Sequence, residues 1–162
     1  MPVVFNYLHL VFAFVWFAAV FGAHWNTMQA RRAKDWAARA TLFGVNRTLS
    51  AMIALPALLG TGIVGNLLAI QLGYRMKDTP MFMVANGLWV LLVLVTLVIE
   101  IPASGALGAL AHASADAAAR GGTGEPAGWA KELGRWRLSN GIQLLLYVVL
   151  LAIMVAPWRA TP

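Results

Sequence analysis

The amino-acid sequence predicts an all-α integral membrane protein, a four-helix bundle with both termini on the outer face of the membrane. Of its 162 residues, 60% are apolar and only 11% are charged, and the mean hydropathy is +0.73. Soluble chains are about half apolar and a quarter charged. Four stretches, 1–30, 48–74, 79–99 and 138–158, contain no Asp, Glu, Lys or Arg. Each is long enough to cross a bilayer as a helix, which takes roughly 20 residues.

The first expected helix covers residues 3–28. No basic residue precedes its apolar stretch and a basic cluster follows it, so we expect it to remain as a transmembrane helix and not to be a signal peptide. The second expected helix covers residues 48–72. It contains Pro56 and a group of small residues from Gly60 to Gly65, which indicates close packing against a neighbouring helix.

The third expected helix covers residues 80–104 and begins at Thr79-Pro80, a favourable N-cap and first-turn pair. An Ala/Gly/Ser-rich segment suggests that it continues to about Arg120. The fourth covers residues 138–157, after a basic amphipathic segment. We therefore expect one membrane domain over residues 1–162. The connections on its inner side cover residues 29–47, between the first two helices, and 105–137, between the last two.

The basic residues predict the orientation of these helices. The net charge is +6 and the pI is near 10.6, but the basic residues lie between the helices, so orientation explains them better than a nucleic-acid partner. By the positive-inside rule, the connections richer in lysine and arginine lie inside a bacterial inner membrane, where they favour anionic lipid headgroups. The expected inner residues are Arg31, Arg32, Lys34, Arg39, Arg47, Arg120, Lys131, Arg135 and Arg137, against Arg75, Lys77 and Arg159 outside.

The absence of cysteine narrows the possible chemistry. It excludes disulfides, thiolate ligands, thioether-linked haem and iron–sulfur clusters. Histidine therefore becomes the leading candidate metal ligand.

His9 lies within an otherwise apolar helix, where an ionisable residue indicates function. Its imidazole suits haem iron and also copper. Trp16 is seven residues further and shares its helix face, so it could pack against a bound ring. The alternative is a histidine that hydrogen-bonds to a neighbouring helix. His24, about 22 Å further along the helix, cannot share a metal with His9; it is either a ligand of a second haem near the inner face or an ordinary interfacial residue.

Glu100 is the only carboxylate within an apolar stretch and precedes Ile101-Pro102. We expect it near the inner boundary, level with His24, Arg47, Arg137 and Asn140. A buried carboxylate needs a partner, so one interpretation is an ion pair with Arg47 or Arg137. The other is a proton relay, or a cofactor site in which an arginine fork binds a propionate.

Several methionines are expected at the outer end: Met76, Met81, Met83 and Met154. Thioethers select Cu(I), although methionine is also an ordinary apolar filler. A haem held by His9 would need a second outer ligand. Met154 is the best chemically, Asn66, Asn86 and Tyr147 are alternatives, and a homodimer that shares its His9 residues is another solution.

One segment of the first helix, Leu8–Ala18, resembles the first helix of HemJ-type protoporphyrinogen oxidases, in which a histidine is followed seven residues later by Trp-Phe-Ala. CopD-type copper-resistance proteins and an uncharacterised bacterial four-helix membrane family have a similar ground plan. The likeness extends to residues 56–62, 137–140 and 153–157. It implies a haem b site with His9 as an axial ligand. The third helix lacks the lysine of HemJ-type proteins, and Gly141 stands where they carry glutamate after Asn140. The uncharacterised family fits the tail and third helix better and implies no activity.

The sequence thus leads to three hypotheses. The first is a membrane-embedded haem b protein that transfers electrons or oxidises a porphyrin or quinone, and is therefore a possible haem-dependent oxidoreductase. The second is a non-catalytic accessory subunit of a larger membrane complex. The third is a protein that handles copper in the outer leaflet.

Overall fold

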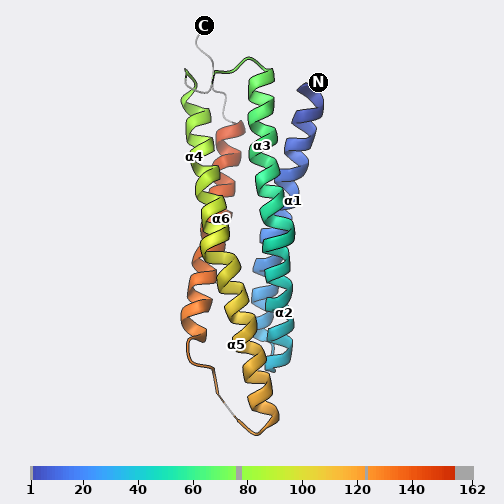
Figure 1. Cartoon of the computed structure of the whole chain (residues 1–162), viewed down its shortest axis with the longest axis vertical. Coiled ribbons are helices and arrows are strands. Elements are labelled where there is room, and N and C mark those ends of the chain that lie inside the picture. Colours follow the sequence, from blue (N-terminus) through green and yellow to red (C-terminus); the bar gives the residue numbers. More distant parts are fainter. Residues whose placement is uncertain (1, 76–77, 123, 156–162) are drawn as a thin grey trace.

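The computed structural model describes residues 2–75, 78–122 and 124–155, and every regular element in them is helical. Four long helical rods run side by side (Figure 1). Within the described residues, each rod is long and apolar enough to cross a membrane, which confirms the expected four-helix membrane architecture. The first rod is α1 (Pro2–Arg32), and the second consists of α2 (Trp36–Thr48), η1 (Leu49–Ala54) and α3 (Leu55–Gln71). The third rod consists of α4 (Pro80–Val95), η3 (Thr96–Glu100) and α5 (Ile101–Ala119), and the fourth is α6 (Trp129–Val155).

The helices extend well beyond the expected membrane segments. The second rod begins at Trp36 because the Asp35 side chain caps it, accepting a hydrogen bond from the Ala38 amide at 2.6 Å. The third rod continues to Ala119, as expected from its composition. Large parts of residues 29–47 and 105–137 are therefore helical. Residues 156 and 157, the expected end of the fourth helix, lie outside the described part.

The second and third rods each contain one wide π-helical turn, η1 and η3, just before a proline. The Leu55 amide donates to the Ser50 carbonyl, and the Ile101 amide donates to the Thr96 carbonyl, five residues back in each case. Pro56 and Pro102 follow directly. Proline has no N–H, and its ring clashes with the carbonyl four residues earlier; the wider turn relieves that clash. Such turns frequently occur at functional sites.

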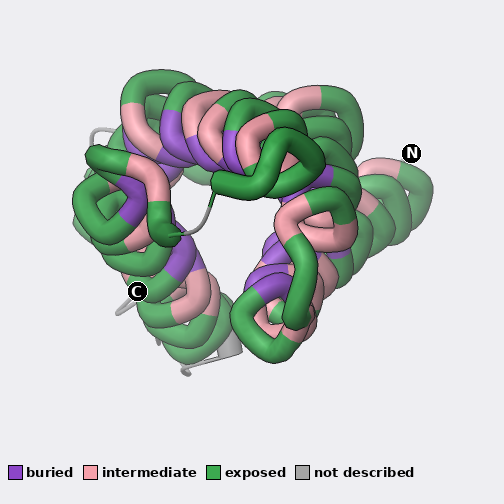
Figure 2. The backbone as a smooth tube through the Cα atoms, turned by 90° about the horizontal axis from the view of Figure 1, so that it is seen from below, coloured by how far each residue is buried: buried purple, intermediate pink, exposed green. Residues whose placement is uncertain are grey.

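The rods pack through small and aromatic residues. The first rod lies along α3, and α2 lies along α5. Viewed along the bundle, buried positions face inwards and exposed positions cover the outside (Figure 2). Many large apolar side chains are exposed on that outside, and such a surface is expected to face lipid, since soluble proteins seldom expose large apolar patches. Examples are Phe14, Met52, Val98, Leu145 and Val148.

Two ends of the bundle can be defined. The terminal end is where α1 begins and α6 ends, and the far end is where α5 leads to α6 (Figure 1). Towards the terminal end, one core cluster includes Trp16, Ala57, Leu58 and Leu92. Towards the far end, another surrounds Phe43, Leu107, Trp129 and Trp136.

Candidate functional site

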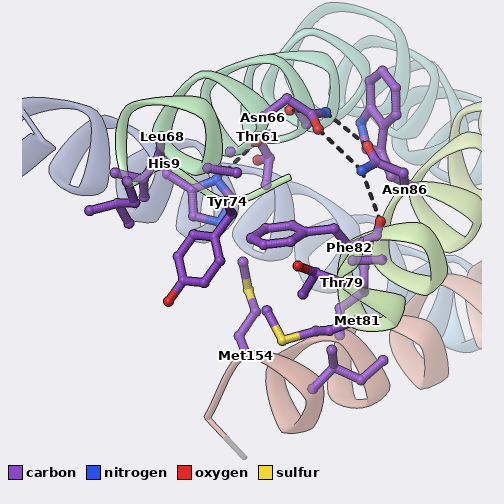
Figure 3. Close-up of a pocket in the computed structure, with 18 of the residues that line it drawn as sticks. His9, Thr61, Asn66, Leu68, Tyr74, Thr79, Met81, Phe82, Asn86 and Met154 are labelled. Carbon is purple, nitrogen blue, oxygen red and sulfur yellow. Dashed lines mark hydrogen bonds between the residues drawn. The ribbon is translucent and has the colours of Figure 1, made fainter. Parts of the chain in front are cut away.

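A cavity of about 880 Å³ opens between the rods at the terminal end. It is lined by residues of α1, α3, α4 and α6 and by the connection after α3. Figure 3 shows His9, Thr61, Asn66, Met81 and Met154 around this space. Ligand sites are typically apolar clefts of about 300–1,000 Å³ with a few placed polar groups. The cavity has both the size and the mixed lining of such a site.

His9 lies at the wall of this cavity with only 6% of its surface exposed. Its Nδ1 lies 2.9 Å from the Thr61 carbonyl oxygen. Because a carbonyl only accepts, Nδ1 carries the hydrogen, and in the neutral ring Nε2 keeps its lone pair. His9 Nε2 is buried and has no hydrogen-bond partner among the described residues. A histidine whose other nitrogen donates to a carbonyl is oriented as metal-ligating histidines usually are.

The glycines of α3 allow this close approach. A Cβ at Gly65 would lie 2.8 Å from His9 Cε1 and 2.9 Å from Nδ1. A Cβ at Gly60 would likewise meet the ring of Phe12 at 2.8 Å, and one at Gly62 would overlap an indole ring of α4. The expected close packing by the small residues of the second helix is confirmed.

A polar pair joins α3 to α4 in the cavity wall. Asn66 donates to the side-chain oxygen of Asn86 at 2.8 Å, and Asn86 donates in return at 3.1 Å. Nearby, the Trp89 indole donates to the Leu58 carbonyl at 2.8 Å. The two asparagines therefore link α3 to α4 within the cavity wall.

Two of the expected methionines line the same cavity as His9. Met81 reaches it from α4 and Met154 from α6 (Figure 3). Met83 is 64% exposed and is not part of the lining, and Met76 lies outside the described residues. The cavity thus combines one imidazole with two thioethers.

Trp16 lies outside the cavity lining. It is buried in the adjacent core cluster, where its ring meets Tyr147 edge-on at a centroid distance of 5.3 Å. Because Trp16 shares a helix face with His9, we expected it to pack against a ring bound there. Two turns of helix separate the two residues, and that packing stays a prediction. Trp16 Nε1 is also buried with no partner among the described residues.

Glu100 occupies a second polar centre, inside the bundle where η1, η3 and α6 meet. It is fully buried; Ser50 donates to Glu100 Oε1 at 2.6 Å, and Ser139 lies 3.5 Å from Oε2. The ion pair considered from the sequence, with Arg47 or Arg137, is not formed within the described residues. Both arginines are exposed, and serines supply the hydrogen bonds instead.

His24 and Asn140 are partners of each other. His24 Nδ1 lies 2.9 Å from Asn140 Oδ1, and Asn140 Nδ2 donates to the Val20 carbonyl at 3.2 Å. The structure thus separates the predicted site residues into two groups. His9 and Met154 line the cavity, whereas Glu100, His24 and Asn140 lie elsewhere. His112 is exposed on α5.

Two residues of the second centre, Ser50 and Ser139, were not identified as site residues from the sequence, and neither was Gln143, one turn after Ser139 on α6. Gln143 is fully buried, and neither atom of its amide has a hydrogen-bond partner among the described residues. Ser139, Gln143 and Tyr147 are spaced by four residues on one face of α6. That polar spacing within an apolar helix was the signal that could have identified Ser139 and Gln143.

The described residues contain no group of three or more histidines and acidic residues that could hold a metal ion. No family model matches the chain, and no curated protein or solved structure is detectably similar to it. The function must therefore be argued from the cavity and the buried polar centre themselves.

Proposed function

We propose that the cavity binds haem b and that the protein transfers electrons in a bacterial inner membrane. The observation that carries this proposal is the state of His9. Its Nδ1 is fixed by the Thr61 carbonyl, and its Nε2 is buried without a partner among the described residues, while the His9 side chain lines a cavity of about 880 Å³. Neutral imidazole oriented in this way is a common ligand of haem iron.

Haem iron, when bound, supplies reversible one-electron transfer. His9 would hold the iron through its imidazole, and the thioether of Met154 or Met81 would supply a second ligand. The hydrogen bond to Thr61 holds the imidazole in one tautomer and orientation. Apolar lining residues such as Leu68 and Phe82 would keep water from the ring.

The propionates need a different arrangement from the one expected. Neither Arg47 nor Arg137 lines the cavity, and the charged residue in the described lining is Asp78. Polar groups of the lining, such as Asn6 and Thr79, would be the ones available to hold the propionates of a bound haem. The proposed electron partner is a quinone or a porphyrin in the membrane, or another subunit if the chain works as a homodimer or within a complex.

The test is the optical absorption spectrum of the purified protein before and after reduction with dithionite. We expect a Soret band that sharpens, together with a b-type α band, in the wild type and in the control His112→Ala, which alters an exposed histidine. His9→Ala should lose the bands. A wild-type protein that stays colourless after expression with added haem would refute haem binding, and bands that survive His9→Ala would refute the ligand assignment.

Copper handling is the second candidate, favoured by the imidazole and the two thioethers in one cavity. Met81 and Met154 together with His9 form a soft donor set suited to Cu(I). The test is competition for Cu(I) against a chromogenic chelator. Met81→Leu and Met154→Leu should each weaken binding, whereas Met83→Leu, at an exposed position, should not. Equal binding by all three variants would reject this candidate. Loss of both haem and copper binding would leave the accessory-subunit hypothesis, tested by co-purification of a partner complex.

A further inference from the structure

The second polar centre, around Glu100, is independent of the cavity. The Glu100 carboxyl is fully buried between η1, η3 and α6, and it receives a short hydrogen bond from Ser50 at 2.6 Å. Ser139 approaches its other oxygen at 3.5 Å. Both neighbours are hydroxyls, which are neutral and can donate or accept.

The charged groups on the surrounding helices do not neutralise this carboxyl. Arg47, one turn before Ser50, is exposed and lies against Gly105. Arg137, on α6, is also exposed. His24, on α1, is hydrogen-bonded to Asn140. An isolated buried carboxylate costs far more free energy than two hydroxyl contacts return, so the arrangement favours a neutral carboxyl.

Gln143 supplies a second and independent observation. Both polar atoms of its amide are fully buried without a partner among the described residues. Leaving such a group unsatisfied is costly, and the internal water molecules of proteins typically bond to buried polar groups that have no protein partner. Gln143 lies one turn beyond Ser139, on the same face of α6. Water bound there would adjoin the Glu100 centre.

The same face of α6 leads on to the cavity. Tyr147 follows one turn after Gln143 and packs against Trp16, whose Nε1 is another buried atom without a partner among the described residues. Leu150 then lines the cavity. The rise from Gln143 to Leu150 is about 10 Å along the helix, and side chains of the core cluster around Trp16 pack along this stretch.

We propose that Glu100 is a proton-binding site, and that water held at Gln143 connects it to its supply of protons. The carboxylate takes up one proton from this water and becomes a neutral carboxylic acid; water regains the proton from the aqueous phase. Ser50 donates to the carboxyl oxygen that stays unprotonated. This site does not depend on haem, so it stands or fails separately from the proposed function.

The experiment is infrared spectroscopy of the full-length, cofactor-free protein in lipid nanodiscs at neutral pH. Expression with ¹³C-carboxyl-labelled glutamate identifies bands from Glu100, Glu125 and Glu132. We expect the carbonyl band of a protonated carboxylic acid, which shifts with the label and disappears in Glu100→Gln. Ser50→Ala should move this band to higher frequency without removing it, because the carbonyl loses a hydrogen bond. This second variant keeps the test decisive if Glu100→Gln does not fold.

The water connection is tested by transfer into D₂O. The shift of the Glu100 band on deuteration should be several-fold slower in Gln143→Leu than in the wild type. The matched control is Gln71→Leu, the same change at an exposed position of α3, which should exchange at the wild-type rate. Equal rates in both variants would overturn the water connection. An absent band would overturn the proton site, and sodium-dependent thermal stability seen in the wild type but not in Glu100→Gln would assign a metal cation instead.

Discussion

Replacing Gly65 by alanine should disturb His9 directly and measurably. The new Cβ would lie 2.8 Å from His9 Cε1 and 2.9 Å from Nδ1, closer than carbon and nitrogen atoms pack. The His9 ring is buried and fixed to the Thr61 carbonyl by a hydrogen bond of 2.9 Å. It can move only by breaking that bond and displacing its neighbours.

The magnitude follows from three contributions. Overpacking a well-packed interior costs about 1–3 kcal/mol, and loss of the His9–Thr61 hydrogen bond costs about 1 kcal/mol. Alanine in place of glycine within a helix stabilises the folded state by about 0.5–1 kcal/mol. The net loss in the free energy of unfolding should therefore be about 2 kcal/mol. Haem or copper bound through His9 should be weakened as well.

The assay is equilibrium unfolding of the purified protein in mixed detergent micelles, with Gly87→Ala as the matched control. Gly87 lies within α4, and a Cβ there would have no atom of the described residues within 4 Å. We expect this control to be as stable as the wild type or slightly more so. In a His9→Ala background, Gly65→Ala should lose its steric cost, so the double-mutant cycle should show a coupling of about 1 kcal/mol or more. A single Gly65→Ala variant as stable as Gly87→Ala would refute the reasoning.

Three further predictions concern the wall of the cavity and the orientation of the chain. Gly62→Ala should destabilise the protein at least as much as Gly65→Ala in the same unfolding assay, because its methyl group would overlap an indole ring of α4; unchanged stability would contradict the α3–α4 contact. Asn66→Leu and Asn86→Leu should show a coupling of about 0.6–1.7 kcal/mol in a double-mutant cycle, since the two amides bond to each other; additive effects would mean that the pair is not formed. The chain has no native cysteine, so Asp78→Cys should react with a membrane-impermeant maleimide added to intact cells and Glu125→Cys should not. The reverse labelling would overturn the predicted orientation.

Much of the fold could be predicted because it depends on strong and simple signals. Charge-free stretches long enough to cross a bilayer determine the four helices, and Thr79-Pro80 correctly marked the start of the third rod. The small residues of α3 correctly indicated close contacts. The start of the second rod at Trp36 was harder to predict from the sequence, because it depends on one hydrogen bond from the Ala38 amide to the Asp35 side chain.

The site was predicted only in part. The spacing of Trp16 from His9 gave their shared helix face, but not the level of Trp16 in the bundle, where it lies in the core cluster beside the cavity. Its packing against a bound ring stays a prediction. For Glu100, the argument that a buried carboxylate needs a partner was sound, but it favoured a cation. Ser50 could not be identified as the actual donor from the sequence, because the contact joins residues 50 positions apart. It depends on how the second and third rods are aligned along their length.

The register of the rods explains why a polar centre and a cavity occur in one small bundle. Pro56 and Pro102 each follow a wide turn, η1 and η3. Ser50 and Glu100 lie within these turns and bond to each other, so the two irregular turns face one another in the interior of the bundle. The extra residue in a π turn changes the helix face that later residues present. The same turns that bring Ser50 to Glu100 therefore also set which faces of α3 and α5 point inwards. On α3, that face carries Thr61 and Gly65 to His9, so the geometry of the cavity depends on the turn beneath it.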